Sequence, residues 1–207
     1  MTSHTQPIYL IRHGETALNA NRTLQPPATP LSARGLTQAQ RLGVRMAPLG
    51  IARILASDLS RAAMTAEAVR ATTGAPLEFD AELHERNFGD WRGTPYDELG
   101  FDPFAEGMSP PNGETWEVFH ERVVRAWRNV LAVAARTDGP LAVVTHGLVC
   151  RGFIAFHAPP APGLAPPAGF RNTSVSVLEP GARAGDWRAT LIDCVAHLDD
   201  ARETGAA

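Results

Sequence analysis

Lysine is missing from this sequence: all 19 basic residues of the 207-residue chain are arginine. Without lysine the protein cannot form a Schiff base or build a P-loop, so any oxyanion must be held by arginine, histidine or backbone N–H groups. Long apolar runs are also missing, since no stretch approaches the roughly 18 residues of a transmembrane helix. A net charge of −3 provides no general attraction to nucleic acid or to an anionic membrane. We therefore expect neither of them as a partner.

Cysteine is scarce, and the two that occur, Cys150 and Cys194, lie far apart. This usage fits reduced thiols in a cytoplasm better than a disulfide framework. The segment before Ile8 lacks the basic and apolar regions of a secretion signal, so we expect a cytoplasmic protein. The histidines show neither H-x-H nor H-E-x-x-H spacing, so we expect no metal site and no cofactor. No pattern indicates the oligomeric state.

The apolar pattern predicts strands that alternate with helices. With 44% hydrophobic residues, the chain suits a single domain over residues 1–207. This order predicts an α/β fold of three layers, α/β/α, around a largely parallel central sheet. The predicted strands are Ile8–Ile11, Ile54–Ala56, Leu141–Val144, Ser174–Leu178 and Trp187–Leu191. The predicted helices are Thr37–Leu49, Leu59–Val69, Glu114–Arg136 and Leu148–Phe156.

Two irregular stretches interrupt this alternation. Residues 87–112 combine glycine, proline and acidic residues with several aromatic residues. We expect this stretch to form a small cap insertion over the carboxyl edge of the sheet. Residues 158–169 are rich in proline, which predicts a surface loop.

Polar residues follow three of the predicted strands at the point where each strand ends. The carboxyl ends of parallel strands meet at one edge, together with helix N-termini, whose N–H groups attract anions. Two arginines and two histidines therefore converge in one crevice that suits a phosphoryl dianion, because arginine donates forked charge-assisted hydrogen bonds. These polar residues are Arg12 and His13 after the first strand, Ser57, Asp58 and Arg61 after the second, and His146 and Gly147 after the third.

Four segments resemble a known family. Leu10–Thr16 resembles the Arg-His-Gly signature of the histidine phosphatase superfamily, the phosphoglycerate mutase-like group. Ser57–Ala66 resembles its second arginine signature, Leu83–Gly93 the segment with its acidic proton donor, and Val144–Gly147 its second-histidine motif. The matches occur in the family's order, and the resemblance reaches from residue 8 to about residue 198.

The resemblance implies a role for each matching residue. His13 is the nucleophile, which attacks phosphorus and forms a phosphohistidine. Arg12, Arg61 and His146 bind the phosphoryl oxygens. Glu85 donates a proton to the leaving oxygen and later accepts one from water.

The resemblance also implies that Asn19, Arg22 and Gln25 help to line the site, and we include Gly147 among the substrate-binding residues. In several relatives a glycine follows the equivalent of Gln25, whereas two prolines follow it here. This difference affects the expected shape of the substrate-side loop and leaves the core chemistry intact.

The acid needs a raised pKa, because it must be protonated when the leaving group departs. We therefore expect Glu85 to be partly buried near the pocket. Glu78, Asp80 and Glu82 are alternative acids, but their alternation is typical of the exposed side of a strand. His84, next to Glu85, either supports the site or is merely exposed.

Two further residues near the motifs have structural interpretations. Asp58 is expected to be the N-cap of the helix that follows it. Cys150 lies within an apolar helix and is expected to be a small core residue.

Three functions remain open. We expect a metal-independent phosphomonoester hydrolase that acts on a small organic phosphate. A phosphoglycerate mutase, which returns the phosphoryl group to a second substrate oxygen, is the alternative, and Arg86 or Arg92 could bind its substrate carboxylate. A non-catalytic scaffold that binds a phospholigand is the third, but it requires a broken site, whereas competent residues fill all four core positions.

Overall fold

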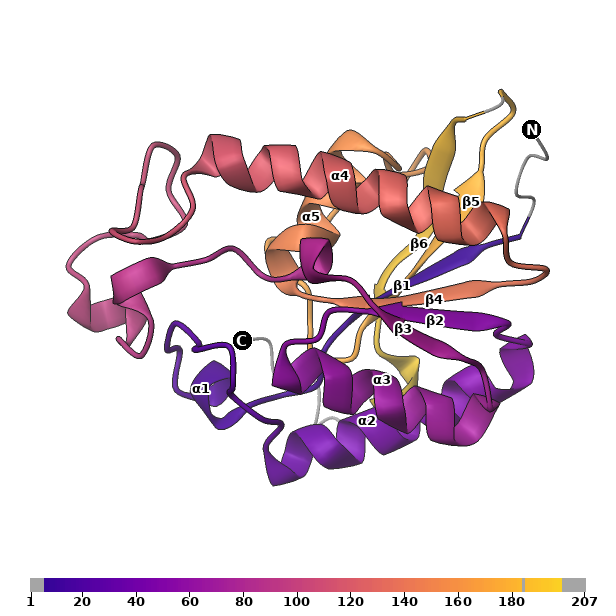
Figure 1. The fold of residues 1–207 in the computed structure, drawn as a ribbon, viewed down its shortest axis with the longest axis horizontal. Helices are drawn as coiled ribbons and strands as arrows, with labels where there is room; N and C mark the ends of the chain where they lie inside the picture. Colours follow the sequence, from indigo (N-terminus) through magenta and orange to yellow (C-terminus); the bar gives the residue numbers. More distant parts are fainter. Residues whose placement is uncertain (1–5, 184, 199–207) are drawn as a thin grey trace.

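The structure is a computed structural model that describes residues 6–183 and 185–198. Its centre is a six-stranded sheet in the order β3-β2-β4-β1-β5-β6 (Figure 1). The first four of these strands are mutually parallel, and β5 and β6 are antiparallel to their neighbours, so the predicted largely parallel sheet is confirmed. The strands are β1 (Ile8–Arg12), β2 (Arg53–Ala56), β3 (Leu77–Phe79), β4 (Leu141–Thr145), β5 (Val175–Pro180) and β6 (Trp187–Cys194).

Helices cover both faces of the sheet and complete the predicted three layers. In Figure 1, α4 and α5 lie on one face, and α2 and α3 lie on the other. The α-helices are α1 (Ala17–Ala20), α2 (Ala33–Met46), α3 (Ser60–Thr73), α4 (Trp116–Ala135) and α5 (Gly147–Phe156). Short 3-10 helices are η1 (Ala47–Leu49), η2 (Ala81–Leu83), η3 (Gly89–Trp91), η4 (Tyr96–Glu98) and η5 (Ala196–Leu198).

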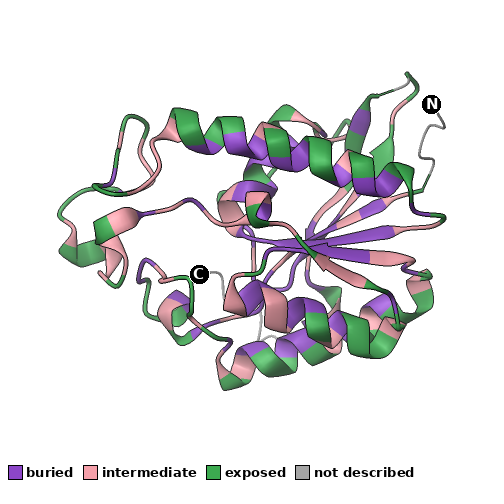
Figure 2. Ribbon diagram, in the orientation of Figure 1, coloured by how far each residue is buried: buried purple, intermediate pink, exposed green. Residues whose placement is uncertain are grey.

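The sheet separates two hydrophobic cores, because successive side chains of a strand point to opposite faces. Ile8 and Leu10 of β1 pack with α4 and α5, whereas Ile11 packs with α2 and α3. Every residue of β4 is buried, which explains why the central strands read as continuous apolar runs. Figure 2 shows the corresponding pattern on the helices, whose buried residues face the sheet.

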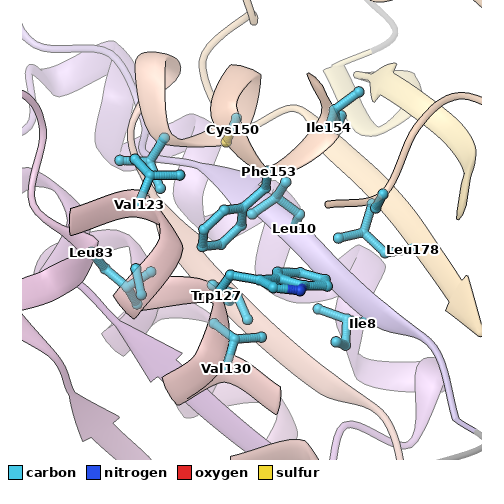
Figure 3. Close-up of a cluster of buried hydrophobic side chains, with 14 of the residues drawn as sticks. Ile8, Leu10, Leu83, Val123, Trp127, Val130, Cys150, Phe153, Ile154 and Leu178 are labelled. Carbon is cyan, nitrogen blue, oxygen red and sulfur yellow. The ribbon is translucent and has the colours of Figure 1, made fainter. Parts of the chain in front are cut away.

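The core beneath α4 and α5 is built around two aromatic rings (Figure 3). Trp127 and Phe153 meet edge to face with ring centroids 5.2 Å apart, next to Ile8 and Leu10. Cys150 belongs to the same cluster, so the prediction of a core cysteine is confirmed. Its burial raises the pKa of the thiol, which keeps the sulfur protonated and unreactive.

Two local predictions about helix starts are wrong. The helix predicted to begin at Thr37 begins at Ala33, because the Ser32 side chain accepts a hydrogen bond from the Gly35 N–H and caps it. Asp58 is not the N-cap of α3: that position is Leu59, which makes no side-chain cap.

The acidic run before Glu85 is only partly strand. β3 ends at Phe79, so Glu78 alone of these acids lies on the strand. There it is half-buried and paired with Arg53 and Arg136 rather than freely exposed. Asp80 instead caps η2, and its carboxylate accepts a hydrogen bond from the Glu82 N–H at 2.9 Å.

The carboxyl ends of β1, β2 and β4 meet at one edge of the sheet, where α3 and α5 begin. Residues 87–112, the cap segment, extend beyond this edge, as predicted (Figure 1). Residues 158–169 form a mostly exposed irregular loop, also as predicted. None of the described helices is long and apolar enough to cross a membrane. Residues 1–5, part of the segment on which we base the lack of a secretion signal, lie outside the described residues.

Candidate active site

A cavity of about 270 Å³ opens at the carboxyl edge of the sheet. The loop around α1, the cap segment and the end of the proline-rich loop contribute to its walls. It brings together almost all of the predicted catalytic and substrate-binding residues. His146 is not part of its lining, and neither is Arg92, the second candidate for binding a substrate carboxylate. Those that line it are Arg12, His13, Asn19, Arg22, Gln25, Arg61, Glu85, Arg86 and Gly147.

His13 follows β1 and is only 2% exposed. Its Nδ1 lies 2.7 Å from the carbonyl oxygen of Gly14, so Nδ1 carries the proton and Nε2 keeps its lone pair. Its own carbonyl accepts a hydrogen bond from the Asn172 side chain at 3.1 Å. Burial, together with Arg61 and Arg12, holds the pKa of His13 well below its ordinary value. The ring is therefore neutral and has a free nucleophilic nitrogen.

Arg12, the last residue of β1, and Arg61, in the first turn of α3, bring positive charge to His13. A terminal nitrogen of Arg12 donates to the Phe170 carbonyl, and one of Arg61 donates to the Pro26 carbonyl at 3.3 Å. The Nε atom of each arginine is buried and has no hydrogen-bond partner among the described residues. Burial lowers the pKa of Arg61 to about 10, so this arginine stays charged at neutral pH.

His146 is the N-cap of α5 and lies next to His13, with ring centroids 5.1 Å apart. Its Nε2 is 2.8 Å from the Ser57 hydroxyl, and within the described structure its buried Nδ1 has no partner. The Ser57 oxygen accepts a hydrogen bond from the Leu59 N–H, which leaves its own hydrogen free to point at His146. Burial, then the charge of Arg61, holds the pKa of His146 well below its ordinary value. Ser57 thereby gains a role that its position at a strand end did not reveal.

Glu85 lies in irregular backbone between η2 and the cap segment. Its carboxylate oxygens accept hydrogen bonds from the Arg86 N–H at 3.0 Å and the Leu148 N–H at 3.3 Å. Burial raises the pKa of Glu85 more than these hydrogen bonds and the charges of Arg61 and Arg12 lower it. The expected partly buried position and raised pKa are both found. The alternative acids of the preceding run do not line the cavity.

The loop around α1 holds its amide side chains by local hydrogen bonds. Asn19 and Thr16 form a reciprocal capping box, and the Thr16 hydroxyl also lies 2.9 Å from the Gln25 side-chain oxygen. Arg22 is exposed at the cavity, and its guanidinium carbon lies 5.4 Å from the centre of the Tyr96 ring. This loop therefore presents one cation and two oriented amides to the cavity.

Arg86 borders the cavity, but its guanidinium faces the protein. It donates to the Glu114 carbonyl at 3.0 and 3.1 Å, to the Pro103 carbonyl at 3.4 Å and to the Met108 carbonyl. It also lies 4.1 Å from the centre of the Trp116 ring. These hydrogen bonds hold the cap segment in place. They use the donors that the expected substrate-binding role of Arg86 would need.

His84 and Asp58 form a partly exposed pair beside the site. The Nε2 of His84 forms a hydrogen bond with the carboxylate of Asp58. His84 is thus partly exposed and bound to Asp58, and neither residue lines the cavity.

An aromatic wall completes the cavity. Phe104 of the cap segment meets Phe88 and Tyr96 edge to face, with ring centroids 5.6 and 5.2 Å away. Phe170, which follows the proline-rich loop, also lines the cavity and was not anticipated from the sequence. The wall makes the cavity suitable for an apolar or aromatic group beside the cations.

Arg151 is a second lining residue that the sequence did not indicate. It lies four residues after Gly147, one helical turn along the same face of α5. It donates to the Ala168 carbonyl and so joins α5 to the proline-rich loop. The helical spacing from Gly147 is the signal that could have identified it.

A family model described as the histidine phosphatase superfamily, branch 1, matches residues 8–193. The chain belongs to this superfamily. Among the described residues of this superfamily member, no three His, Cys, Asp or Glu side chains are grouped so that they could hold a metal ion.

The relatives of this chain include proteins named as mutases and proteins named as phosphatases. A probable phosphoglycerate mutase, GpmB, from Salmonella paratyphi B is 30% identical over 205 residues, which cover 93% of this chain and 94% of that protein. YhfR of Bacillus stearothermophilus is 32% identical, with a TM-score of 0.77 and coverage of 93% and 98%. A mycobacterial glucosyl-3-phosphoglycerate phosphatase is 25% identical, with a TM-score of 0.75 and coverage of 92% and 99%. Both phosphatases and phosphoglycerate mutase-like proteins are therefore among its neighbours.

Proposed function

We propose that this member of the superfamily hydrolyses a small organic phosphomonoester through a phosphohistidine intermediate. The observation that carries the proposal is the set of groups around one cavity: a neutral His13 with a free Nε2, two guanidinium groups with unpaired buried Nε atoms, and an acid with a raised pKa. Buried cationic donors without partners are costly. A phosphoryl dianion at this position satisfies them.

In the first step, the Nε2 of His13 attacks phosphorus and the bond to the leaving oxygen breaks. Glu85 gives its proton to that oxygen, and the alcohol departs. Arg12 and Arg61 stabilise the charge that spreads over the three other phosphoryl oxygens. The hydrogen bond from Nδ1 to the Gly14 carbonyl supports the positive charge that the ring acquires.

In the second step, water attacks the phosphohistidine and the phosphorus–nitrogen bond breaks. The Glu85 carboxylate accepts a proton from that water, which restores the protonated acid, and His13 returns to its neutral form. A positioned acid and base of this kind typically contributes roughly 10²–10⁴-fold to the rate.

His146, whose ring lies next to that of His13, contributes a further hydrogen-bond donor. With the Ser57 hydroxyl donating to its Nε2, the neutral ring carries its hydrogen on Nδ1. We assign this Nδ1–H to a phosphoryl oxygen next to the His13 ring. Ser57 then acts as a positioning residue that selects the tautomer.

The size of the cavity supports a small substrate. Its volume of about 270 Å³ lies just below the range of about 300–1,000 Å³ typical of pockets for drug-sized ligands. The cationic groups and the aromatic wall line the same cavity. A phosphomonoester with a compact apolar or aromatic leaving group fits both.

A phosphoglycerate mutase is the second candidate. It is favoured by Arg22 and Arg151, two exposed cations at the cavity that could hold a second acidic group of a substrate. Isomerisation of a phosphoglycerate that requires a bisphosphoglycerate primer would support the mutase. Release of inorganic phosphate without a primer supports the phosphatase.

The experiment is phosphate release from p-nitrophenyl phosphate with EDTA present, together with trapping of a phosphorylated enzyme by rapid alkaline quench. We expect His13→Ala to fold, to lose activity by several orders of magnitude and to form no phosphoenzyme. His120→Ala, which removes an exposed histidine of α4, is the matched control and should behave as the wild type. Retained activity in His13→Ala removes the mechanism.

A further inference from the structure

Arg122 of α4 is an almost fully buried residue, 9% exposed, whose partners lie in the backbone that leads to Glu85. One terminal nitrogen donates to the carbonyls of Glu82 and His84, both at 2.8 Å, and the other donates to the carbonyl of Glu85 at 3.2 Å. The two remaining N–H groups bind the carboxylate of Glu114 at 2.7 and 2.8 Å. All five donors of the guanidinium are therefore used.

Glu114 connects Arg122 to the backbone that follows Glu85. Its carboxylate accepts a hydrogen bond from the Asn87 N–H at 2.8 Å in addition to those from Arg122. Burial opposes its charge, but the hydrogen bonds from Arg122 and Asn87 outweigh burial and hold the pKa of Glu114 below its ordinary value. The pair thus holds backbone groups both before and after the acid.

The backbone that carries Glu85 needs such support because it belongs to neither a helix nor a strand. The carbonyl of Leu83 is held by the Thr145 hydroxyl at 2.7 Å, so four consecutive carbonyls up to Glu85 bind side chains. Among the described residues, two N–H groups hold the Glu85 carboxylate itself. Its distance from a leaving oxygen therefore also depends on where Arg122, Glu114 and Thr145 hold the chain.

We propose that Arg122 and Glu114 are positioning residues for the proton transfer by Glu85. This inference rests on the proposed function of Glu85 as the acid. A displacement of about 1 Å can cost on the order of 10²-fold in rate, so loss of the fork should act on proton transfer before it acts on phosphate binding. Arg12, Arg61 and His13 belong to other elements, β1 and α3 or the residue after β1, and remain in place.

The test compares two aromatic substrates that differ in their need for a proton. Benzyl phosphate releases an alkoxide and depends on the acid, whereas p-nitrophenyl phosphate releases a stable phenolate. Arg122→Lys keeps the charge but loses the fork. We expect kcat/KM, which reports the first chemical step and not the hydrolysis of the phosphohistidine, to fall at least about tenfold for benzyl phosphate and less than about threefold for p-nitrophenyl phosphate.

The matched control is Arg125→Lys, the same substitution three residues further along α4. Arg125 touches the carboxylate of Glu82 and no backbone carbonyl of the run, so both substrates should be turned over at the wild-type rate. In Glu85→Gln, adding Arg122→Lys should cause no further selective loss on benzyl phosphate, because both changes remove one function.

Three outcomes are informative. Equal slowing of both substrates by Arg122→Lys, or no slowing of either, overturns the positioning role, provided that circular dichroism shows a folded protein. If Arg122→Lys does not fold, Glu114→Gln decides by the same two assays. Failure of Glu85→Gln itself to discriminate between the substrates overturns the proposed acid instead, so the two failures are distinguishable.

Discussion

Two pairs of arginines border the same catalytic region and use their hydrogen-bond donors differently. In the phosphate-side pair, Arg12 and Arg61, each guanidinium binds one backbone carbonyl and keeps a buried Nε without a partner among the described residues. In the cap-side pair, Arg86 and Arg122, nearly every donor binds a carbonyl or a carboxylate. Burial does not distinguish the two uses, since Arg61 and Arg86 are 2% and 1% exposed.

The difference separates a ligand-binding cation from an architectural one. A buried guanidinium with unused donors lowers the stability of the free protein, and it regains that energy only when an anion arrives. A saturated guanidinium stabilises the chain around it and has little left for a ligand. The comparison predicts that removal of one kind costs activity and removal of the other costs stability.

Among the arginine variants, the largest expected effect comes from Arg61→Met, which keeps the volume and removes the charge. We expect kcat/KM for p-nitrophenyl phosphate to fall by about 10²–10³-fold, as for loss of one donor to a developing anion. The free energy of unfolding should stay the same or rise, because a poorly compensated buried charge disappears. Urea denaturation and steady-state kinetics measure both quantities. A large loss of stability here would break the comparison.

Arg86→Met should show the opposite behaviour. The substitution leaves the carbonyls of Pro103, Met108 and Glu114 without their donor, and each unpaired buried group costs about 1–3 kcal/mol. We expect the free energy of unfolding to fall by about 3 kcal/mol in total, since neighbouring groups relax. Activity per folded molecule should fall far less than in Arg61→Met. If the free energy of unfolding stays unchanged while activity is lost, Arg86 binds the substrate after all.

The phosphate side could be predicted from the sequence because its signals are local. Apolar runs reveal β1 and β4, and polar residues mark the ends of strands. A general property of parallel sheets then brings residues as distant as His13 and His146 to one edge. Nothing about the folding of the loops is needed for this inference.

The cap side could not be predicted, because its contacts depend on how irregular backbone folds back. Arg86 and Arg122 bind carbonyls of residues 82–85 and 103–114, and carbonyl direction leaves no trace in a residue pattern. In the sequence, Arg122 cannot be distinguished from any other charged residue on the exposed face of a helix. The prediction that Asp58 is a helix N-cap failed for a similar reason. Its side chain forms a tertiary contact with His84 in place of the local cap.

The pH dependence of activity tests Glu85, which is affected by both arginine pairs. Arg61 and Arg12 lower its pKa, and Arg122 holds its backbone carbonyl. The pKa of His13 is lowered, so protonation of the nucleophile causes the acid limb of activity below its ordinary pKa. The pKa of Glu85 is raised, so loss of its proton causes the basic limb above its ordinary pKa. Above the raised pKa of Glu85, the wild-type to Glu85→Gln ratio of kcat/KM for benzyl phosphate should fall about tenfold per pH unit. A ratio independent of pH would contradict the role of Glu85.

The smallest effect should be stabilisation by inorganic phosphate, which reports directly on which arginine pair receives the anion. At a phosphate concentration ten times its Kd, the free energy of unfolding of the wild type should rise by about 1.4 kcal/mol, because phosphate binds only the folded state. Arg61→Met should lose this gain at the same concentration, since the unpaired donors are the groups that bind phosphate. Arg86→Met should keep it, although its unfolding starts from a lower baseline. Equal gains in both variants would place the anion away from Arg61 and remove the distinction between the two pairs.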